Sequence, residues 1–340
     1  MLPPQNMIAP LAKFIDWSVL QTGSAMFPKS LREPGPGLKL EEAVRFLKGP
    51  DFIPAESPPA KVQFDDALHF RFPTPRPSKF PENNVVYGRL YRCGERWRER
   101  PAIILLHGGV DPIHYRFGFP LIARQCNRAG FNAATLESPY HYQRRPRQYS
   151  TLGVLGPYIP LTPDYFQMAE TYAQAVSEIR GLTSWLLAEG CPAVALAGVS
   201  LGGWMAGITV CRDARLAAVV VALAPARQGN ILSQLEHVAG RRARELLLSR
   251  RAACEELVRT LLNPGTSRPA ISREKLLLIE GIHDLLVSIG PEEIWQSWGQ
   301  PEIWRLPHGH ISTFFMPGLA GRIIGWLAPR LEKSALSAPR

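Results

Sequence analysis

Short apolar runs alternate with helix-like segments between about residue 60 and residue 330. Apart from the first two, which have mixed polarity, the runs are continuously apolar and of strand length, as is typical of strands buried on both faces of a parallel sheet. The strand candidates are 61–72, 84–92, 102–107, 131–137, 193–199, 217–223, 275–280 and 302–306. The longest helix-like segment between them runs from about Asp164 to Glu189. This alternation predicts an α/β fold with a mostly parallel eight-stranded sheet and helices on both faces.

Some parts of the chain depart from this alternation. Residues 1–59 are rich in proline and hold two short helical patterns, which predicts an N-terminal extension packed on a main domain of residues 60–330. Residues 227–272 place a basic amphipathic segment between two strand candidates. A helical cap or lid over the carboxyl ends of the strands and an ordinary helical excursion both fit this insertion. Residues 331–340 are expected to form a tail.

The composition is that of a soluble globular protein, with 46% apolar and 20% charged residues. No apolar run reaches the roughly 18–20 residues of a membrane-spanning helix. Residues 1–20 lack the features of a secretory signal, so we expect a cytoplasmic protein. The net charge of +10 favours a solvated basic surface, with peripheral contact to an anionic membrane as the alternative. No nucleic-acid motif accompanies the charge, so no nucleic-acid partner is expected.

The five cysteines are scattered and form no Cys-x-x-Cys pair. This spacing predicts free thiols in a reducing compartment, with neither a disulfide framework nor a zinc site. We expect no metal and no organic cofactor. The sequence does not define an oligomeric state.

The stretch LAGVSLGGWMAG, residues 196–207, places Ser200 between Gly198 and Gly202. The apolar run before Ser200 predicts a strand, and the residues after it predict a helix. A sharp strand-to-helix turn of this kind exposes a serine Oγ, and it needs small neighbours because side chains would collide there. Ser200 is therefore the candidate nucleophile, and a glycine-rich turn without chemistry is the alternative.

A nucleophilic serine needs a general base and an acid that orients the base, in the chain order serine, acid, histidine for such a strand–turn–helix site. Asp284 follows the strand candidate 275–280, and both His308 and His310 follow the last strand candidate. We expect Asp284 to be the acid and His310 to be the base, with His308 as the second choice. His283 adjoins Asp284 and is expected to be a neighbour without a role.

Stabilising the negative oxygen that forms during acyl transfer requires two backbone N–H groups. The amide of Leu201 is one candidate because Leu201 directly follows the serine. The other is expected from the sequence HGGVD after the strand candidate 102–107. Glycine lets the backbone approach a substrate closely, so Gly109 is the favoured donor and Val110 the second.

The stretches LLHGGVD, TLESPYHYQRRPRQYSTLG, WLLAEG, LAGVSLGGWMAG and GIHDLLV together resemble the α/β-hydrolase family typified by α/β-hydrolase domain-containing protein 18. The similarity covers roughly residues 60 to 330. LESPYHYQRRP is its most specific part and is similar to the LENPYYG-x-R-x-P stretch of that family, although Tyr142 stands where the family tends to have glycine. The resemblance implies an α/β-hydrolase fold with Ser200, Asp284 and His310 as a catalytic triad. It does not imply a particular substrate.

The stretch HYQRRPRQ places Arg144, Arg145 and Arg147 in the loop after strand candidate 131–137. Ligands bind at the carboxyl edge of such sheets, and guanidinium groups bind carboxylate and phosphate, so Arg144 and Arg145 are candidates for holding an anionic substrate or lipid headgroup. A set of salt bridges that clamps the loop is slightly favoured over this role. Glu137 is the expected internal partner.

These observations together predict a serine hydrolase that cleaves a carboxylic ester through an acyl-enzyme. The expected substrate is a small-molecule or lipid ester. A peptidase or amidase, a thioesterase or an acyltransferase with the same triad stays open. The rival of another class is a non-catalytic protein that uses the same fold to bind a lipid or a partner.

Overall fold

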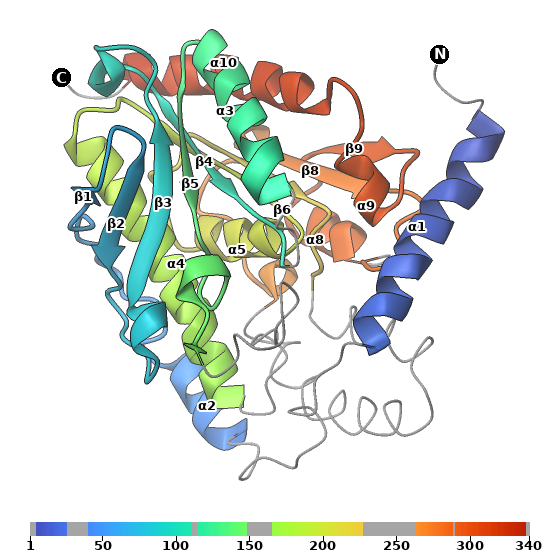
Figure 1. Cartoon of the computed structure of the whole chain (residues 1–340), viewed down its shortest axis with the longest axis horizontal. Helices are drawn as coiled ribbons and strands as arrows, with labels where there is room; N and C mark the ends of the chain where they lie inside the picture. Colours follow the sequence, from blue (N-terminus) through green and yellow to red (C-terminus); the bar gives the residue numbers. More distant parts are fainter. Residues whose placement is uncertain are drawn as a thin grey trace.

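The computed structural model describes residues 5–25, 40–109, 114–147, 165–226, 263–287 and 290–337. Its centre is a nine-stranded sheet (Figure 1). The strands are β1 Gln63–Phe64, β2 His69–Pro73, β3 Val85–Tyr91, β4 Ala102–Leu106, β5 Asn132–Leu136, β6 Val194–Val199, β7 Ala218–Ala222, β8 Leu276–Gly281 and β9 Glu302–Leu306. Their spatial order is β1-β2-β3-β5-β4-β6-β7-β8-β9. In this spatial order every pair from β5 through β4, β6, β7 and β8 to β9 is parallel. The pairs β1–β2, β2–β3 and β3–β5 are antiparallel, so β1, β2 and β3 form an antiparallel edge.

The sheet has one strand more than the eight expected, because the strand candidate 61–72 folds back on itself. Asp66 makes the turn, with its Oδ1 accepting hydrogen bonds from the backbone N–H groups of Leu68 at 2.7 Å and His69 at 2.6 Å. The residues before and after the turn pair as β1 and β2, with Phe64 opposite Phe70. A short polar side chain that bonds the next backbone N–H groups is a typical turn signal within a mixed-polarity run.

The parallel strands are buried on both faces. Along β4, Ile104 and Leu106 contribute to one hydrophobic core, and Ile103 and Leu105 contribute to the other. This division follows from the pleat of a strand, which sends successive side chains to opposite faces. Continuous apolar runs are thus needed to fill two cores at once, as the sequence pattern indicated.

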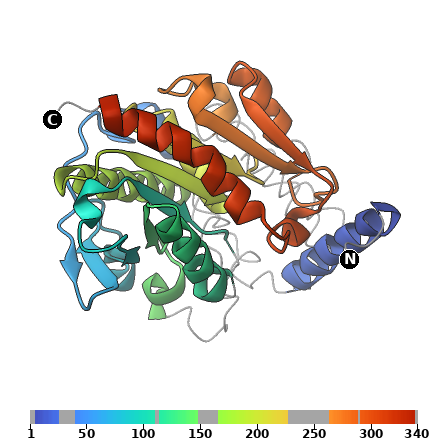
Figure 2. The ribbon, with the colours of Figure 1, turned by 90° about the horizontal axis from the view of Figure 1, so that it is seen from above.

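Helices cover both faces of the sheet (Figures 1 and 2). They are α1 Gln5–Ala25, α2 Leu40–Lys48, α3 Phe119–Arg128, α4 Tyr165–Ala188, α5 Leu201–Val210, α8 Gly290–Ser297, α9 His310–Thr313 and α10 Leu319–Ser337. The core on one face takes side chains from α2, α4, α5 and α8, and the core on the other face takes them from α3 and α10. Helix α10 includes residues 331–337, which the sequence suggested as a tail, because Leu331 is buried in the second core.

The two described segments of residues 1–59 pack in different places. Helix α2 contributes Ala43 and Leu47 to the core beneath α4. Helix α1 lies beside the short helix α9, at the end of the sheet opposite β1 (Figure 1). On the described part of α1, only Ala12 and Asp16 are buried, and these two residues are one helical turn apart.

Most of the insertion at 227–272 lies outside the described residues, which resume at Asn263. From there a short helical turn, Pro264–Thr266, packs beside α8, and the Trp298 indole N–H donates to the carbonyl of Pro264 at 2.9 Å. Among the helices of the described chain, none is long and apolar enough to cross a membrane.

Candidate active site

Ser200 sits at the sharp turn between β6 and α5, with a φ of 55° and a ψ of −118°. A positive φ is strained for a residue with a side chain, and such strain is typical of functional turns. The Ser200 N–H donates to the carbonyl of Ala222 at 2.8 Å, which ties the turn to the neighbouring strand β7. The serine side chain is half-buried.

The two glycines around Ser200 are required by close backbone contacts. A Cβ on Gly198 would lie 2.1 Å from the carbonyl oxygen of Gly202. A Cβ on Gly202 would lie 2.3 Å from the carbonyl oxygen of Leu106, at the end of β4. The turn is therefore packed against the start of the HGG loop, and only glycine allows this approach.

The structure brings Ser200, His310 and Asp284 together in one hydrogen-bonded chain. Nε2 of His310 lies 3.0 Å from Oγ of Ser200, and Nδ1 of the same ring lies 2.7 Å from Oδ2 of Asp284. The other carboxylate oxygen of Asp284 accepts from the N–H groups of Leu286 at 2.7 Å and Val287 at 2.9 Å. Asp284 and His310 are both buried, at 7% and 3% exposure. The ring orientation is thus fixed from the carboxylate side.

The other two histidines near these loops lie in different positions. His308 comes just before the turn to α9, and burial together with the charge of His283 lowers the pKa of its ring. The backbone N–H of His283 donates to the carbonyl of His308 at 3.1 Å, so the two loops are joined there by main-chain contact. The contacts with Ser200 and Asp284 come from His310.

Two buried histidines hold the carbonyls of the HGG loop. The N–H of Ser138 donates to Nε2 of His107 at 3.0 Å, so Nδ1 of that ring carries the proton and donates to the carbonyl of Gly108 at 2.7 Å. Nε2 of His141 lies 2.8 Å from the carbonyl oxygen of Gly109. The peptide groups before and after Gly109 therefore each have their carbonyl against an imidazole ring: the carbonyl of Gly108 against His107 and that of Gly109 against His141. Val110, the second candidate donor, lies outside the described residues.

His141 comes from the LESPYHY stretch, whose backbone is strained on both sides of it. Tyr140 and Tyr142 have φ values of 64° and 47°. Glycine adopts the left-handed backbone found at Tyr142 without strain. In this chain the tyrosine ring stacks on Tyr115, with 4.4 Å between ring centroids, and this contact offsets part of the strain.

Arg144 does not face a substrate site. Its side chain is completely buried and forms a bidentate ion pair with Glu178 of α4, with both N–O distances 2.7 Å. The same guanidinium donates to the backbone carbonyls of Asn83 and Glu137, each at 2.8 Å. The suggestion that Arg144 binds an anionic substrate is therefore revised: the loop clamp, which the sequence slightly favoured, describes its contacts. The clamping carboxylate belongs to Glu178, and Glu137 contributes its carbonyl.

The neighbouring arginines of this loop are more accessible. Arg145 is partly buried, and its backbone N–H donates to the carbonyl of Tyr142 at 3.4 Å. The side chain of Arg147 is 92% exposed and lies 3.5 Å from Glu82. A role for Arg145 in binding substrate stays a prediction.

Sequence reasoning missed Asp16 of α1. This aspartate is completely buried, and its carboxylate accepts hydrogen bonds from the backbone N–H groups of Leu285, His310 and Ile311. One weak signal was present, since Asp16 is the one acidic residue of the helical pattern 10–21. Burial raises its pKa, and the three N–H donors act in the opposite direction.

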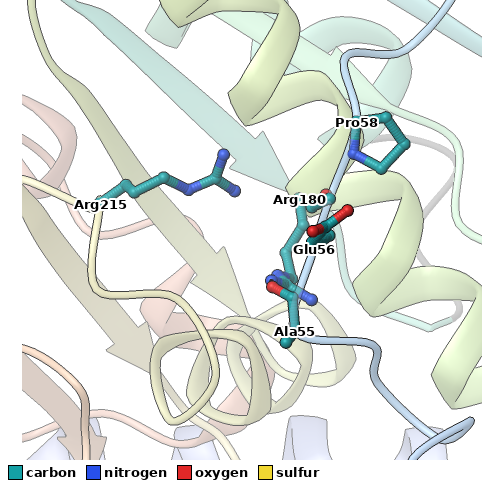
Figure 3. A pocket seen from close by; sticks show the side chains of 6 residues that line it. Ala55, Glu56, Pro58, Arg180 and Arg215 are labelled. Atoms are coloured by element: carbon teal, nitrogen blue, oxygen red, sulfur yellow. The ribbon is translucent and has the colours of Figure 1, made fainter.

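A pocket of about 440 Å³ lies elsewhere in the molecule (Figure 3). It is lined by Ala55, Glu56, Ser57, Pro58, Arg180 and Arg215. Arg215 precedes β7, so this pocket is at the amino-terminal edge of the sheet, whereas Ser200 follows the carboxyl end of β6. Arg180 donates to the carbonyls of Pro54 and Ala55, and Arg215 is paired with Asp213. Both guanidinium groups are thus engaged by the protein itself.

No group of three or more His, Cys, Asp or Glu side chains in the described ranges is arranged to hold a metal ion. The four described cysteines, Cys93, Cys126, Cys191 and Cys211, are free thiols.

The sheet order, the helices on both faces and the serine turn after β6 define the class: the chain has the α/β-hydrolase fold. Solved structures of this fold superpose on most of it. The acetyl xylan esterase 1 of Thermoanaerobacterium sp. JW/SL YS485 has a TM-score of 0.55 at 11% identity, over 86% of this chain and 93% of that one. The Pyrococcus furiosus esterase Pf2001 has a TM-score of 0.51 at 16% identity, over 81% of this chain and 98% of that one.

The family comparison is more specific. Residues 65–232 match the family model described as alpha/beta hydrolase domain containing 18. This match confirms the resemblance inferred from the LESPYHYQRRP and LAGVSLGGWMAG stretches. The chain is also 26% identical over 351 residues to an uncharacterized protein of Mycobacterium tuberculosis, Rv2627c, over 93% of this chain and 78% of that protein.

Proposed function

We propose that this protein is a serine hydrolase that cleaves a carboxylic ester through an acyl-enzyme intermediate. The observation that carries the proposal is the chain of hydrogen bonds from Ser200 through His310 to Asp284, at 3.0 Å and 2.7 Å. A serine within hydrogen-bond reach of a base that is itself oriented by a third group is the arrangement that activates a hydroxyl nucleophile. In this proposal Ser200 is the nucleophile, His310 the general base and Asp284 the orienting acid.

The proposed reaction begins when Oγ of Ser200 attacks the acyl carbon while Nε2 of His310 takes the hydroxyl proton. Asp284 accepts the Nδ1 proton in a hydrogen bond and stabilises the imidazolium that forms. The tetrahedral intermediate then collapses, the bond to the leaving oxygen breaks, and His310 gives its proton to the departing alcohol. A water molecule, deprotonated by the same ring, releases the acyl group from Ser200 by the reverse sequence.

We assign the stabilisation of the tetrahedral oxyanion to the backbone N–H groups of Leu201 and Gly109. Leu201 is the first residue of α5, and the first N–H groups of a helix have no partner within the helix. No cis peptide bond occurs among the described residues, so the N–H of Gly109 points opposite to the carbonyl of Gly108, which His107 holds. A fixed peptide plane supplies a donor that does not have to reorganise during the reaction.

The choice of an ester over an amide is supported by two structures with this fold, which are named as esterases. An oxygen ester also has the better leaving group, so it is the substrate that an activated serine cleaves most readily. We infer a small-molecule or lipid ester as the substrate. The acyl and alcohol parts are to be found by assay.

The test is labelling with a fluorophosphonate, which reacts with activated serines, followed by mass spectrometry to locate the modified residue. We expect labelling at Ser200 that is lost in Ser200→Ala and slowed strongly in His310→Ala. In parallel, p-nitrophenyl esters and p-nitroanilide amides of the same acyl groups report which bond is cleaved.

Each outcome of this test has a defined meaning. Labelling at Ser200 with ester turnover supports the proposal. Amide turnover that equals or exceeds ester turnover would replace it with an amidase or peptidase. A folded sample that neither labels nor turns over any substrate, yet binds liposomes equally well as wild type and as Ser200→Ala, would favour a binding protein.

A further inference from the structure

Asp16 of α1 joins the two loops that carry the proposed acid and base. Its Oδ2 accepts hydrogen bonds from the N–H of His310 at 2.7 Å and from the N–H of Leu285 at 3.1 Å. Its Oδ1 accepts from the N–H of Ile311 at 3.0 Å. Leu285 directly follows Asp284 in the chain, so one carboxylate fixes the backbone of the base and the backbone beside the acid.

The contact with α9 is a helix cap supplied from a distant part of the chain. The first N–H groups of a helix need outside acceptors, and usually the side chain of the residue before the helix provides one. That residue is Gly309, which has no side chain to offer. Asp16 accepts from the N–H groups of His310 and Ile311, the first two residues of α9, and so takes the place of the missing cap.

Gly309 is also what lets α1 come this close. A Cβ at this position would lie 2.7 Å from Oδ2 of Asp16 and 3.1 Å from the carbonyl oxygen of Ala12. Its φ of −87° and ψ of −174° are extended values that any residue adopts, so backbone conformation does not demand glycine here. The demand comes from α1, whose two buried residues, Ala12 and Asp16, are the ones that face this glycine.

We propose that Asp16 is a positioning residue of the active site, and that α1 is therefore part of the hydrolytic machinery. This inference rests on the proposed function of Ser200, His310 and Asp284. Asp16 holds the backbone of the two loops so that the His310 ring sits between Ser200 and Asp284. It acts through these residues and does not itself touch the reacting atoms.

The physical reason is the length of the two loops and the precision that proton transfer requires. Residues 282–285 and 307–310 follow strand ends and are joined to each other by the bond from the N–H of His283 to the carbonyl of His308. Beyond that bond, the backbone at Leu285 and at His310 would keep some freedom to move without a common anchor. A misplacement of about 1 Å of a catalytic group can cost about 100-fold in rate. A buried carboxylate with N–H donors from both loops removes this freedom.

The test is Asp16→Asn in the full chain, with Lys13→Ala on the exposed face of the same helix as the matched control. Asparagine has the same shape, but its amide nitrogen is a donor and would face backbone N–H groups, so part of the anchor is lost. We expect the rate constant of fluorophosphonate labelling at Ser200 and the kcat for an ester to fall by about 100-fold, with KM nearly unchanged. The final extent of labelling should stay near that of the wild type, which separates slow activation from a misfolded fraction.

A second variant tests the same contact without changing a charge. Gly309→Ala places a methyl group against Asp16 and Ala12, so α1 must shift, and we expect a loss of labelling rate similar to that of Asp16→Asn. If wild type labels at Ser200 while both variants keep its labelling rate and kcat, Asp16 has no positioning role and the proposed function still stands. If wild type itself neither labels nor turns over ester, the proposed function fails, and with it this inference.

Discussion

Arg144 and Glu178 form a bidentate ion pair that is buried completely on the arginine side and 97% on the glutamate side. Removing one partner of such a pair leaves a buried charge without compensation, which costs about 3–5 kcal/mol. We therefore predict that Arg144→Met and Glu178→Leu each lower the free energy of unfolding by about this amount. The double variant should lose clearly less than the sum of the two. Urea denaturation of the wild type, the two single variants and the double variant measures this double-mutant cycle.

The control for this cycle is Arg147→Met, three residues along the same loop. Its side chain is 92% exposed, so we expect a change within about 0.5 kcal/mol. Additive losses in the double variant would contradict the ion-pair interpretation. If Arg144→Met changed the KM for anionic substrates without changing stability, Arg144 would be assigned to substrate binding instead.

His308 and His310 offer a matched pair for testing which ring is the base. Only His310 has contacts to both Ser200 and Asp284 among the described hydrogen bonds. We predict that His310→Ala lowers kcat for an ester by about 10⁴-fold or more, the range seen when a member of such a triad is removed. His308→Ala should keep kcat close to that of the wild type. The reverse result would show that the base is His308.

His141 should make the protein less stable in acid. Burial lowers its pKa to about 4 from the ordinary 6.5, with the charges of Arg144 and Arg145 acting in the same direction. In the unfolded chain His141 therefore takes up a proton below about pH 6.5, whereas in the folded chain it takes up this proton only below about pH 4. Stability from this group is complete above pH 6.5 and declines as the pH falls, by about 3 kcal/mol in all.

The ring nitrogens of His141 lie 2.8 Å from the carbonyl oxygens of Pro139 and Gly109. The variant His141→Gln isolates the titration, because glutamine can donate to one of these two carbonyls but does not titrate. We predict that the wild type loses about 3 kcal/mol more than His141→Gln between pH 7 and pH 4. Denaturant midpoints at several pH values measure the difference, and titration of all other groups cancels between the two proteins. Parallel pH curves would disprove the assignment.

Two glycines should respond to alanine in opposite directions. In Gly202→Ala the new Cβ would lie 2.3 Å from the carbonyl oxygen of Leu106, and main chain on both sides cannot yield. We predict a loss of at least about 3 kcal/mol. Gly325 lies within α10 with nothing within 4 Å of its Cβ position. Gly325→Ala should gain about 0.5–1 kcal/mol, because alanine favours a helix. Thermal unfolding distinguishes the two.

Much of the fold could be predicted because its strands and helices show in local patterns of apolar and polar residues. Buried parallel strands such as β4 and β7 must be apolar throughout, and helices between them show as separate segments, so their order along the chain was visible. The Gly198-x-Ser200-x-Gly202 turn was visible for the same reason, since steric crowding restricts its residues. The placement of Asp284 and His310 after the last two strands followed from chain order.

The parts that sequence reasoning missed depend on contacts between distant residues. Asp66 breaks a strand candidate through its own side chain, and this was a local signal that a mixed-polarity run obscured. The partner of Arg144 was expected at Glu137, seven residues away, and is instead Glu178 on a different helix. The role of Asp16 depends on Leu285 and Ile311, which no pattern within α1 could indicate.

The bond between Asp16 and His310 joins residues 294 positions apart. At about 5–20 residues per second, a ribosome needs roughly 15–60 s to travel from the first to the second. Before that time is over the central strands can pair and the serine turn can form, yet the anchor of the acid and base loops still has no partner. A nascent chain is therefore expected to be folded in its middle well before it is competent at its site.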